Sequence, residues 1–219
     1  SADYTLTINS QYTNASSAST TDKGKLICAS GHIHAYNADA ACTSDRVAVI
    51  CYVGSATGNS TYNHGLALAL YDANGGNAST NGSSCQWKTS SGTTDNSYQT
   101  TSSSFASEDG SVYRTSRNNG TWPAFQACIS YNGGNAPTNS TGWFLPSAYQ
   151  WNQMVSSVGN YSSLRDYFSS KGGRNMQSDY YWSCTEYSAN GAWYLRFGSG
   201  TWRDGHKAGG NYVRSALAF

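Results

Sequence analysis

Tyr180-Tyr181-Trp182-Ser183-Cys184-Thr185-Glu186-Tyr187 is an aromatic-rich segment with the composition of a β-strand, and the rest of the fold is organised around it. A second apolar segment, Val213-Arg214-Ser215-Ala216-Leu217-Ala218-Phe219, closes the sequence. Its apolar residues alternate, and Leu217 and Phe219 would be in contact with water if this terminus were frayed. We therefore expect the terminal segment to be a strand that is docked into a sheet.

A further strand is expected between these two segments. Trp193, Leu195 and Phe197 alternate with Tyr194 and Arg196, which is the period-two pattern of a strand with one buried face. The pattern predicts that the first three side chains face the core.

The segment from Gly198 to Tyr212 has a different composition. Its glycines, at 198, 200, 205, 209 and 210, predict an irregular loop rather than a regular element. The loop also carries Trp202, Arg203 and His206, and such a mixture of aromatic and polar groups on irregular backbone is typical of a recognition surface. An ordinary long surface loop is the alternative.

The overall composition indicates a domain that carries little charge. The 219 residues suffice for one sizeable domain, and 13 Lys and Arg against 12 Asp and Glu give a net charge of +1. This balance gives no case for binding nucleic acid or an anionic membrane. The mean hydropathy is −0.55, and because no run of 18 apolar residues occurs, we expect no membrane insertion.

The residues that carry chemistry predict neither a metal site nor an enzyme. Six cysteines, at 28, 42, 51, 85, 128 and 184, suit an oxidising compartment, and their roughly 15 possible pairings stay open. Cys51 lies in an apolar run, where a buried free thiol is as plausible as a disulfide. His32 and His34 lack a third ligand nearby, which favours a polar turn over a metal site. No hydrolase, metalloprotease or nucleotide-binding motif occurs, so we expect no enzyme activity, no metal and no cofactor.

Taken in order, the chain begins with residues 1–23, which predict an edge strand around Tyr4-Ile8 or a linker. Val47 to Val53 predicts a buried central strand, and Gly65 to Tyr71 a second strand. Residues 73–111 lack periodicity, which predicts loops with a short helix near Val112.

Two helices are expected in the last third of the sequence. Ser147 follows Pro146 and predicts the N-cap of a helix that buries Trp151, Met154, Val155 and Val158 and ends at Gly159. A second helix is predicted over Ser162 to Ser170, with Leu164, Tyr167 and Phe168 buried and glycine after it.

Several of these segments together resemble a known family. Gly142-Trp143-Phe144-Leu145-Pro146-Ser147, Gln150-Trp151, Tyr181 to Glu186, Ala192-Trp193 and the terminal segment are similar to C-type-lectin-fold domains of bacterial surface and phage proteins. These include the variable proteins of diversity-generating retroelements, some from gut Bacteroidales, and the Fibrobacter-type paralogous domains. The resemblance implies an α+β fold over residues 24–219, in which two helices flank antiparallel sheets and a long C-terminal loop and strand form the ligand face.

The resemblance also implies a contact surface inside a variable region of about residues 182–219. In such proteins template adenines are mutagenised, so asparagine codons become other residues while scaffold codons stay fixed. Trp202 and Lys207 are not reachable from the codon AAC and would be fixed or derive from other codons. The expected contact residues are Asn190, Gly191, Arg196, Gly198, Thr201, Trp202, Arg203, Asp204, Gly205, His206, Ala208, Gly209, Gly210, Asn211 and Tyr212.

We therefore expect a ligand-binding adhesin or receptor-binding protein, extracellular on a cell or virion surface. Its partner would be a protein or cell-surface ligand, and it would be attached to a larger pilus, envelope or phage-tail protein. The calcium-binding tripeptides of animal C-type lectins are missing, so no calcium is expected. The alternatives are an oxidase similar to formylglycine-generating enzymes, in which Cys184 would be essential, and a structural pilus or tail subunit. For the binding surface, replacing Trp202 and Arg203 together should weaken binding and leave melting nearly unchanged.

Overall fold

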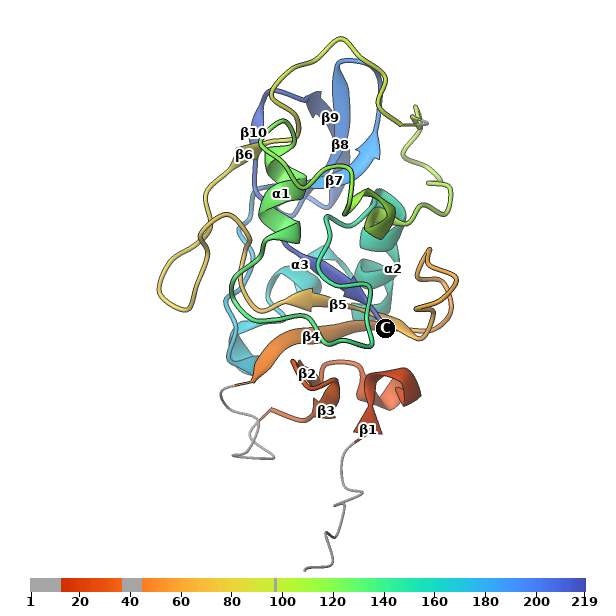
Figure 1. Cartoon of the computed structure of the whole chain (residues 1–219), viewed down its shortest axis with the longest axis vertical. Helices are drawn as coiled ribbons and strands as arrows, with labels where there is room; N and C mark the ends of the chain where they lie inside the picture. Colours follow the sequence, from red (N-terminus) through yellow and green to blue (C-terminus); the bar gives the residue numbers. More distant parts are fainter. Residues whose placement is uncertain (1–12, 37–44, 97) are drawn as a thin grey trace, which may run out of the picture.

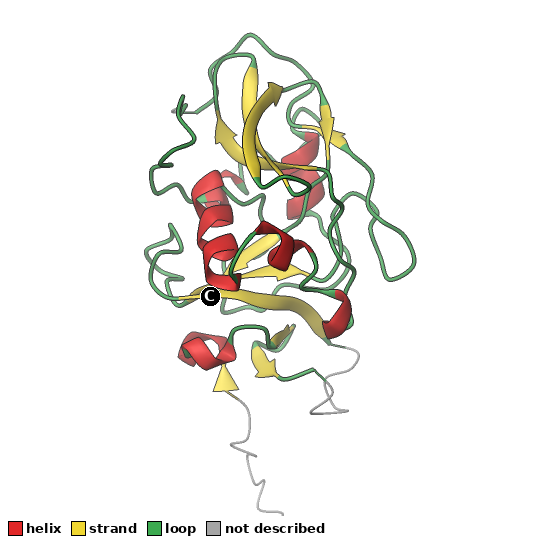
Figure 2. Cartoon of the chain, turned by 180° about the vertical axis from the view of Figure 1, so that it is seen from behind, coloured by secondary structure: helices red, strands yellow, loops and turns green. Residues whose placement is uncertain are grey.

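The computed structural model describes residues 13–36, 45–96 and 98–219. The expected strand at Tyr4-Ile8 lies outside these residues, as does Cys42. The two larger of three antiparallel sheets lie toward opposite ends of the described chain, with helices between them (Figures 1 and 2). The molecule is therefore a mixed structure of helices and antiparallel sheets, which confirms the α+β class.

The larger sheet has the order β1-β3-β2-β4-β5-β11, with all neighbours antiparallel. Its strands are β1 (Thr13–Asn14), β2 (Leu26–Cys28), β3 (His32–His34), β4 (Arg46–Val53), β5 (Gly65–Ala69) and β11 (Ala216–Ala218). Residues 47–51 of β4 and the whole of β5 are buried. A strand with both faces covered reads as a nearly continuous apolar run, and this confirms the two strands expected from the sequence.

The C-terminal segment is docked as expected. Ala216, Leu217 and Ala218 pair with Leu68, Ala67 and Leu66 of β5, and Phe219 is only 1% exposed. The backbone N–H of Phe144 also donates to the carbonyl of Ala216, at 2.9 Å. The end of the chain therefore joins the large sheet to the segment before the second helix.

The smaller sheet has the order β7-β8-β9, with β7 (Tyr180–Glu186), β8 (Gly191–Arg196) and β9 (Thr201–His206). Its edge is extended by a short ribbon of β6 (Cys85–Gln86) and β10 (Gly210–Asn211), because Tyr212 bridges to Tyr181 of β7. Trp193, Leu195 and Phe197 are all buried and Arg196 is exposed, which confirms the predicted alternation.

The expectation of an irregular loop from Gly198 to Tyr212 is wrong for residues 201–206. These residues pair regularly with β8, from Thr201 opposite Arg196 to His206 opposite Gly191. Gly205 is the glycine inside the strand, and a Cβ there would lie 2.8 Å from Tyr194 Cε1. The glycine therefore makes room for the neighbouring aromatic ring and does not interrupt the strand.

Helix α2 (Ala148–Val158) lies between the sheets and contacts both β4 and β7 (Figure 1). Its start is fixed by a capping box, in which the Ser147 hydroxyl accepts from the backbone of Gln150 and the Gln150 side chain accepts from the backbone of Ser147. Gly159 ends the helix with a φ of 121°. The predicted helix is confirmed, with Trp151 and Met154 fully buried, whereas Val155 and Val158, also expected to be buried, are half-buried.

The other helices differ from the expectation. Helix α3 (Tyr161–Arg165) is shorter than predicted and is followed by a 3₁₀ turn at Ser169–Lys171. Helix α1 (Pro123–Ile129) was not expected. Further 3₁₀ turns span Ala15–Ser17, Thr20–Asp22 and Gly110–Tyr113, the last of them close to the short helix expected near Val112.

Two further features concern the state of the cysteines and the possibility of a membrane-spanning helix. Cys28 is disulfide-bonded, while the free thiols of the described residues are those of Cys51, Cys85, Cys128 and Cys184. Within the same residues, each helix is too short or too polar to cross a membrane.

Candidate functional site

One surface of the smaller sheet carries aromatic and cationic side chains that face solvent. Tyr180 lies opposite Arg196, which lies opposite Thr201, and Tyr194 lies opposite Arg203. Directly opposite residues of antiparallel strands share a face, so these five side chains belong to one surface. The same surface continues into the core at Trp182, which lies opposite Tyr194 and is buried, and we call its solvent-facing part, made of these five residues, the outer face. Arg196, Thr201 and Arg203 are exposed, and the two tyrosines are half-buried.

The aromatic groups of the outer face hold each other in place. The Tyr180 and Tyr194 rings lie 5.0 Å apart, and the Arg196 guanidinium lies 5.5 Å above the Tyr180 ring. Burial raises the pKa of the Tyr194 hydroxyl, and the nearby Tyr180 and Asp204 add to the rise. Tyr194 is therefore a neutral hydroxyl at physiological pH, beside two arginines.

The opposite surface of the sheet, which we call the inner face, packs against the protein. Trp193 and Trp202 both contact Phe105, with ring centroids 5.4 and 4.9 Å apart. The Trp202 indole N–H also donates to Asn152 Oδ1 of α2, at 2.9 Å. The inner face thus fastens β9 to helix α2.

The turn after β9 is ordered by its own hydrogen bonds. His206 Nδ1 accepts from the backbone N–H of Ala208 at 3.3 Å, and the carbonyl of His206 accepts from Gly209 at 2.7 Å. These bonds fix the imidazole of an exposed residue at the edge of the sheet. Asp204, also exposed, lies on the same strand.

Lys207 lies next to this exposed edge but is fully buried. Its ammonium group donates to Glu186 Oε1 at 2.6 Å, to Asp95 Oδ2 at 2.8 Å and to the carbonyl of Thr93 at 2.8 Å. A buried charge requires such complete pairing, because desolvation costs several kcal/mol per ion. Lys207 is therefore part of the scaffold.

The carboxylates around Lys207 anchor a loop to the sheet. Glu186 accepts hydrogen bonds from the backbone N–H groups of Asp95 and Asn96. Burial raises the pKa of Asp95, but hydrogen bonds and charge from Lys207 and Lys88 outweigh it and hold the pKa below its usual value. The loop over residues 88–96 is thus attached to β7 through Glu186 and to the residue after β9 through the ion pair of Asp95 with Lys207.

The expected contact residues lie together at one end of the molecule but differ in exposure. Those that are exposed are Asn190, Arg196, Gly198, Thr201, Arg203, Asp204, His206, Gly209 and Gly210. Those that are half-buried are Trp202, Gly205, Ala208 and Tyr212, and those that are buried are Gly191 and Asn211.

Trp202, expected to be a ligand-contact residue, packs against the protein itself. Its side chain belongs to the inner face, so the expectation that its loss leaves melting unchanged does not fit its packing against Phe105 and Asn152. Tyr212 also points inward, because its ring stacks on the buried Tyr181 with centroids 5.6 Å apart. The sequence reasoning missed Tyr180 and Tyr194, although the alternation already places Tyr194 on the same side as Arg196.

The remaining candidate residues are His32, His34 and Cys184. No group of three or more His, Cys, Asp or Glu side chains in the described parts of the chain is placed to hold a metal ion. His32 and His34 lie on β3 with ring centroids 6.2 Å apart. Cys184 is fully buried, and burial raises the pKa of its thiol well above the usual value, which keeps it protonated.

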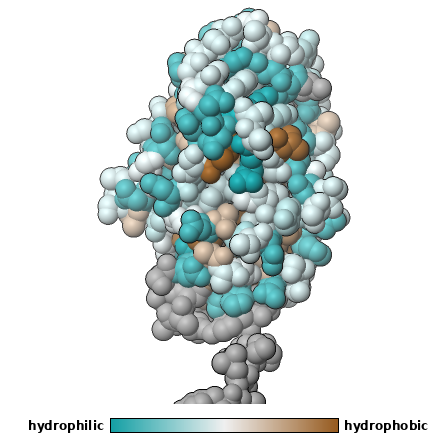
Figure 3. All heavy atoms as spheres, viewed as in Figure 1, coloured by the Kyte–Doolittle hydropathy of each residue, from teal (hydrophilic) through white to brown (hydrophobic). Residues whose placement is uncertain are grey.

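The surface of the described residues is mainly polar. In the view of Figure 3 hydrophilic and neutral residues dominate, and hydrophobic ones are scattered. The large hydrophobic side chains that are exposed in the described residues are those of Tyr36, Tyr98 and Val112. A partner of this domain therefore meets hydrogen-bonding groups and aromatic rings rather than an apolar patch.

The sequence matches no protein-family model, and no curated protein is similar to it. Among solved structures, the chain is similar to a fimbrial protein from Bacteroides ovatus, with a TM-score of 0.59 and 18% sequence identity. The similarity covers 90% of this chain and 48% of the fimbrial protein, so the chain spans about half of that protein's length. At this identity the comparison shows a shared fold.

Proposed function

We propose that this chain is a domain of a bacterial surface protein of the fimbrial kind, which contacts a neighbouring subunit through the outer face of β7, β8 and β9. The observation that carries the proposal is the fold that it shares, over nine-tenths of its length, with a fimbrial protein. Fold alone does not determine function, so the surface chemistry has to supply the contact.

The composition of the outer face supports this contact. Tyrosine and arginine are enriched at protein interfaces and dominate their binding energy, since each combines a large area with a hydrogen-bonding group. On the outer face, Tyr180 and Tyr194 support two exposed arginines, Arg196 and Arg203. Strand β9 pairs only with β8 among the described residues, so its other edge also offers backbone groups to a partner.

A ligand-binding adhesin is the second candidate. It is favoured by the way in which the exposed residues follow one another along β9 and the turn after it, with Arg203, Asp204 and His206 in sequence. In this version the fold is a C-type lectin fold and the contact positions are diversified by a retroelement. Sequencing DNA beside the gene for a near-copy of the last segment, altered mainly at adenines, tests this version.

The proposal places the domain outside the cell and gives it no enzyme activity. An oxidase of the formylglycine-generating kind would need a reactive thiolate, whereas burial keeps the Cys184 thiol protonated and out of contact with solvent. The low charge and the polar surface support a role in display rather than in catalysis.

The test is incorporation of tagged protein into filaments sheared from the surface of the producing bacterium. We compare wild type with Tyr194→Ala and Arg203→Glu, and use Arg174→Gln, on a different surface, as the matched control. If the outer face is a subunit interface, both outer-face variants should reach the cell surface but be missing from the sheared filaments. The control variant should be present in the filaments like the wild type.

The same experiment separates the two candidates. Variants that enter filaments normally but no longer attach the cells to a host surface would favour the adhesin. If the wild type never enters filaments and the outer-face variants change neither incorporation nor attachment, the proposal is wrong.

A further inference from the structure

A second surface of the molecule, away from the outer face, forms a polar hollow. It has a volume of about 370 Å³ and lies between the loop at residues 78–81 and the segment at residues 169–177. This volume is near the lower end of the range for small-molecule sites, about 300–1,000 Å³. The expected contact residues and the outer face contribute nothing to its lining.

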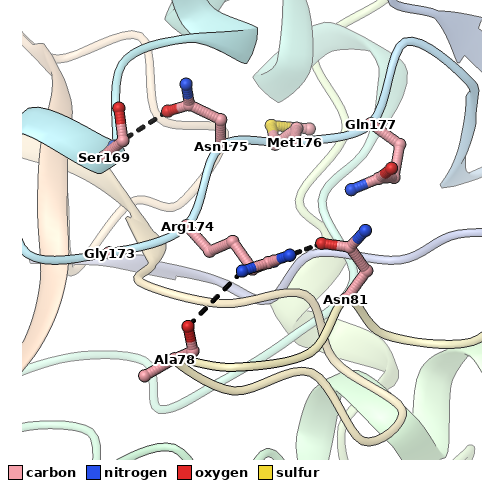
Figure 4. Close-up of a pocket in the computed structure, with 8 residues that line it drawn as sticks. All are labelled: Ala78, Asn81, Ser169, Gly173, Arg174, Asn175, Met176 and Gln177. Atoms are coloured by element: carbon pink, nitrogen blue, oxygen red, sulfur yellow. Dashed lines mark hydrogen bonds between the residues drawn. The ribbon is translucent and has the colours of Figure 1, made fainter.

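The residues at the centre of the hollow present hydrogen-bond donors. Figure 4 shows Asn81, Arg174 and Gln177 converging from the two segments. The Arg174 side chain donates to Asn81 Oδ1 and, at 3.4 Å, to the carbonyl of Ala78. The Asn81 amide also carries an NH₂ group that can donate to a ligand.

Charge in the hollow is uncompensated. Arg174 is the charged residue of the lining, which contains no carboxylate, and both of its acceptors are neutral oxygens. In the described residues the side-chain amide of Gln177 makes no hydrogen bond, and its backbone N–H is held by the Tyr181 hydroxyl at 2.8 Å. The site therefore offers a guanidinium and amide donors to a ligand that supplies acceptors and negative charge.

The backbone that carries these donors is fixed before any ligand binds. Arg174 donates its N–H to Leu70 at 2.9 Å, and its carbonyl accepts from the buried Arg214 at 2.9 Å. Asn175 Oδ1 accepts from the N–H groups of Phe168 and Ser169, at 3.1 and 2.8 Å. Such preorganisation lowers the entropy lost on binding.

Gly173 brings this segment close to the large sheet. A Cβ at this position would lie 2.8 Å from the carbonyl oxygen of Leu70, so a side chain does not fit there without movement. The buried Met176 lies on the same segment and gives the lining an apolar part beside the donors. The hollow thus combines fixed donors, one cation and a small apolar surface.

We propose that this hollow binds a small carboxylate ligand of about the size of a sugar acid, with the carboxylate on Arg174 and further ligand oxygens on Asn81 and Gln177. The carboxylate matches the guanidinium in charge and in its paired acceptors. Two sources supply such a group in a ligand of this size, an acidic monosaccharide and the end of a short peptide.

The test is an NMR titration of the full 219-residue chain with matched acids and neutral compounds. D-glucuronate is compared with its methyl ester, and N-acetylglycylglycine with its amide. We expect one acid to shift the signals of residues 173–177 with a Kd on the order of 1 mM, and its neutral counterpart to bind at least about tenfold more weakly. The acid that binds identifies the source.

Variants of the hollow complete the test. Arg174→Gln should weaken the binding of that acid by about tenfold to a hundredfold, because it removes the charged donor. Arg203→Ala, on the outer face, should leave it unchanged. The proposal is overturned if neither acid binds, if the neutral compounds bind equally well, or if a folded Arg174→Gln protein binds like the wild type. None of these outcomes bears on filament incorporation, so failure here leaves the proposed function standing.

Discussion

The inner and outer faces of the β7–β8–β9 sheet share the same strands but serve different purposes. The neighbouring residues Trp202 and Arg203 of β9 show this difference. Trp202 packs against Phe105 and helix α2, whereas Arg203 is exposed. Lys207, immediately after the strand, is buried among carboxylates. A change of a single position along the chain therefore separates a residue that holds the fold from a residue that is free to serve binding.

This comparison explains how the outer face can tolerate substitution. The contacts that fix β9 lie behind it, in the inner face and in the ion pairs of Lys207, and these contacts do not use the side chains of the outer face. Substitutions on the two faces should therefore separate into those that change stability and those that change only binding.

The largest effect on stability is expected from Lys207→Met. This change leaves Glu186 buried without its cation and Asp95 with Lys88 alone, so we expect a loss of about 3–5 kcal/mol in the free energy of unfolding. Chemical denaturation of the purified variants measures this loss.

Lys23→Met is the matched control, because Lys23 is exposed and, within the described residues, its ammonium group donates to the backbone carbonyl of Ser157. The double variant Lys207→Met with Glu186→Gln should recover part of the stability, since it removes the unpaired charge. If Lys207→Met unfolds at the same denaturant concentration as Lys23→Met, the buried network does not hold the sheet.

A smaller loss is expected from Trp202→Ala. The variant loses the ring contact with Phe105 and the hydrogen bond to Asn152, and because Trp202 is only half-buried we expect about 2 kcal/mol. Thermal and chemical unfolding measure the change, with Arg203→Ala as the adjacent control. Equal stability of the two variants would mean that the inner face does not contribute more to stability than the outer face, contrary to the contacts in the structure.

The elements that follow local rules could be predicted from the sequence. Strand β4 contains a continuous apolar run, β8 alternates from Trp193 onward, and helix α2 begins at a serine cap and ends at glycine. Helix α1 was missed, although Pro123 at its first turn is a typical start signal, because the helix has only seven residues. Short helices carry too few apolar residues to show a period.

The site was harder to predict because its organisation depends on distant residues. Glycine is a poor strand former, so Gly205 and its neighbours indicate a loop, whereas the Tyr194 and Trp182 rings beside Gly205 explain why the strand tolerates it. The partners of Lys207 include Asp95, which is 112 residues away in a segment without periodicity. No local pattern connects two such residues, so the sequence could not distinguish a buried lysine from an exposed one.

A pH dependence is expected from Asp95, whose pKa is held below its usual value by Lys207 and Lys88 in spite of burial. A carboxylate with a lowered pKa in the folded state stabilises the fold above its unfolded pKa of about 3.9, and this stabilisation is lost as the pH falls through the folded value. Unfolding measured from pH 7 downward should therefore show a loss of stability below about pH 4 that is weaker in Asp95→Asn. Asp204→Asn, which removes an exposed carboxylate, should keep the acid sensitivity of the wild type, and identical profiles for all three proteins would contradict the assignment.

The smallest effects on stability are expected from the exposed arginines of the outer face. Arg203→Ala should change the free energy of unfolding by no more than about 0.5 kcal/mol, because the side chain is exposed and has no ion pair within the described residues. Arg196→Ala should cost slightly more, up to about 1 kcal/mol, because its guanidinium lies over the Tyr180 ring. Differential scanning calorimetry of both variants and of the double variant measures this order. A loss from Arg203→Ala as large as that from Trp202→Ala would place Arg203 in the scaffold, and the outer face would then no longer be separable from the fold that supports it.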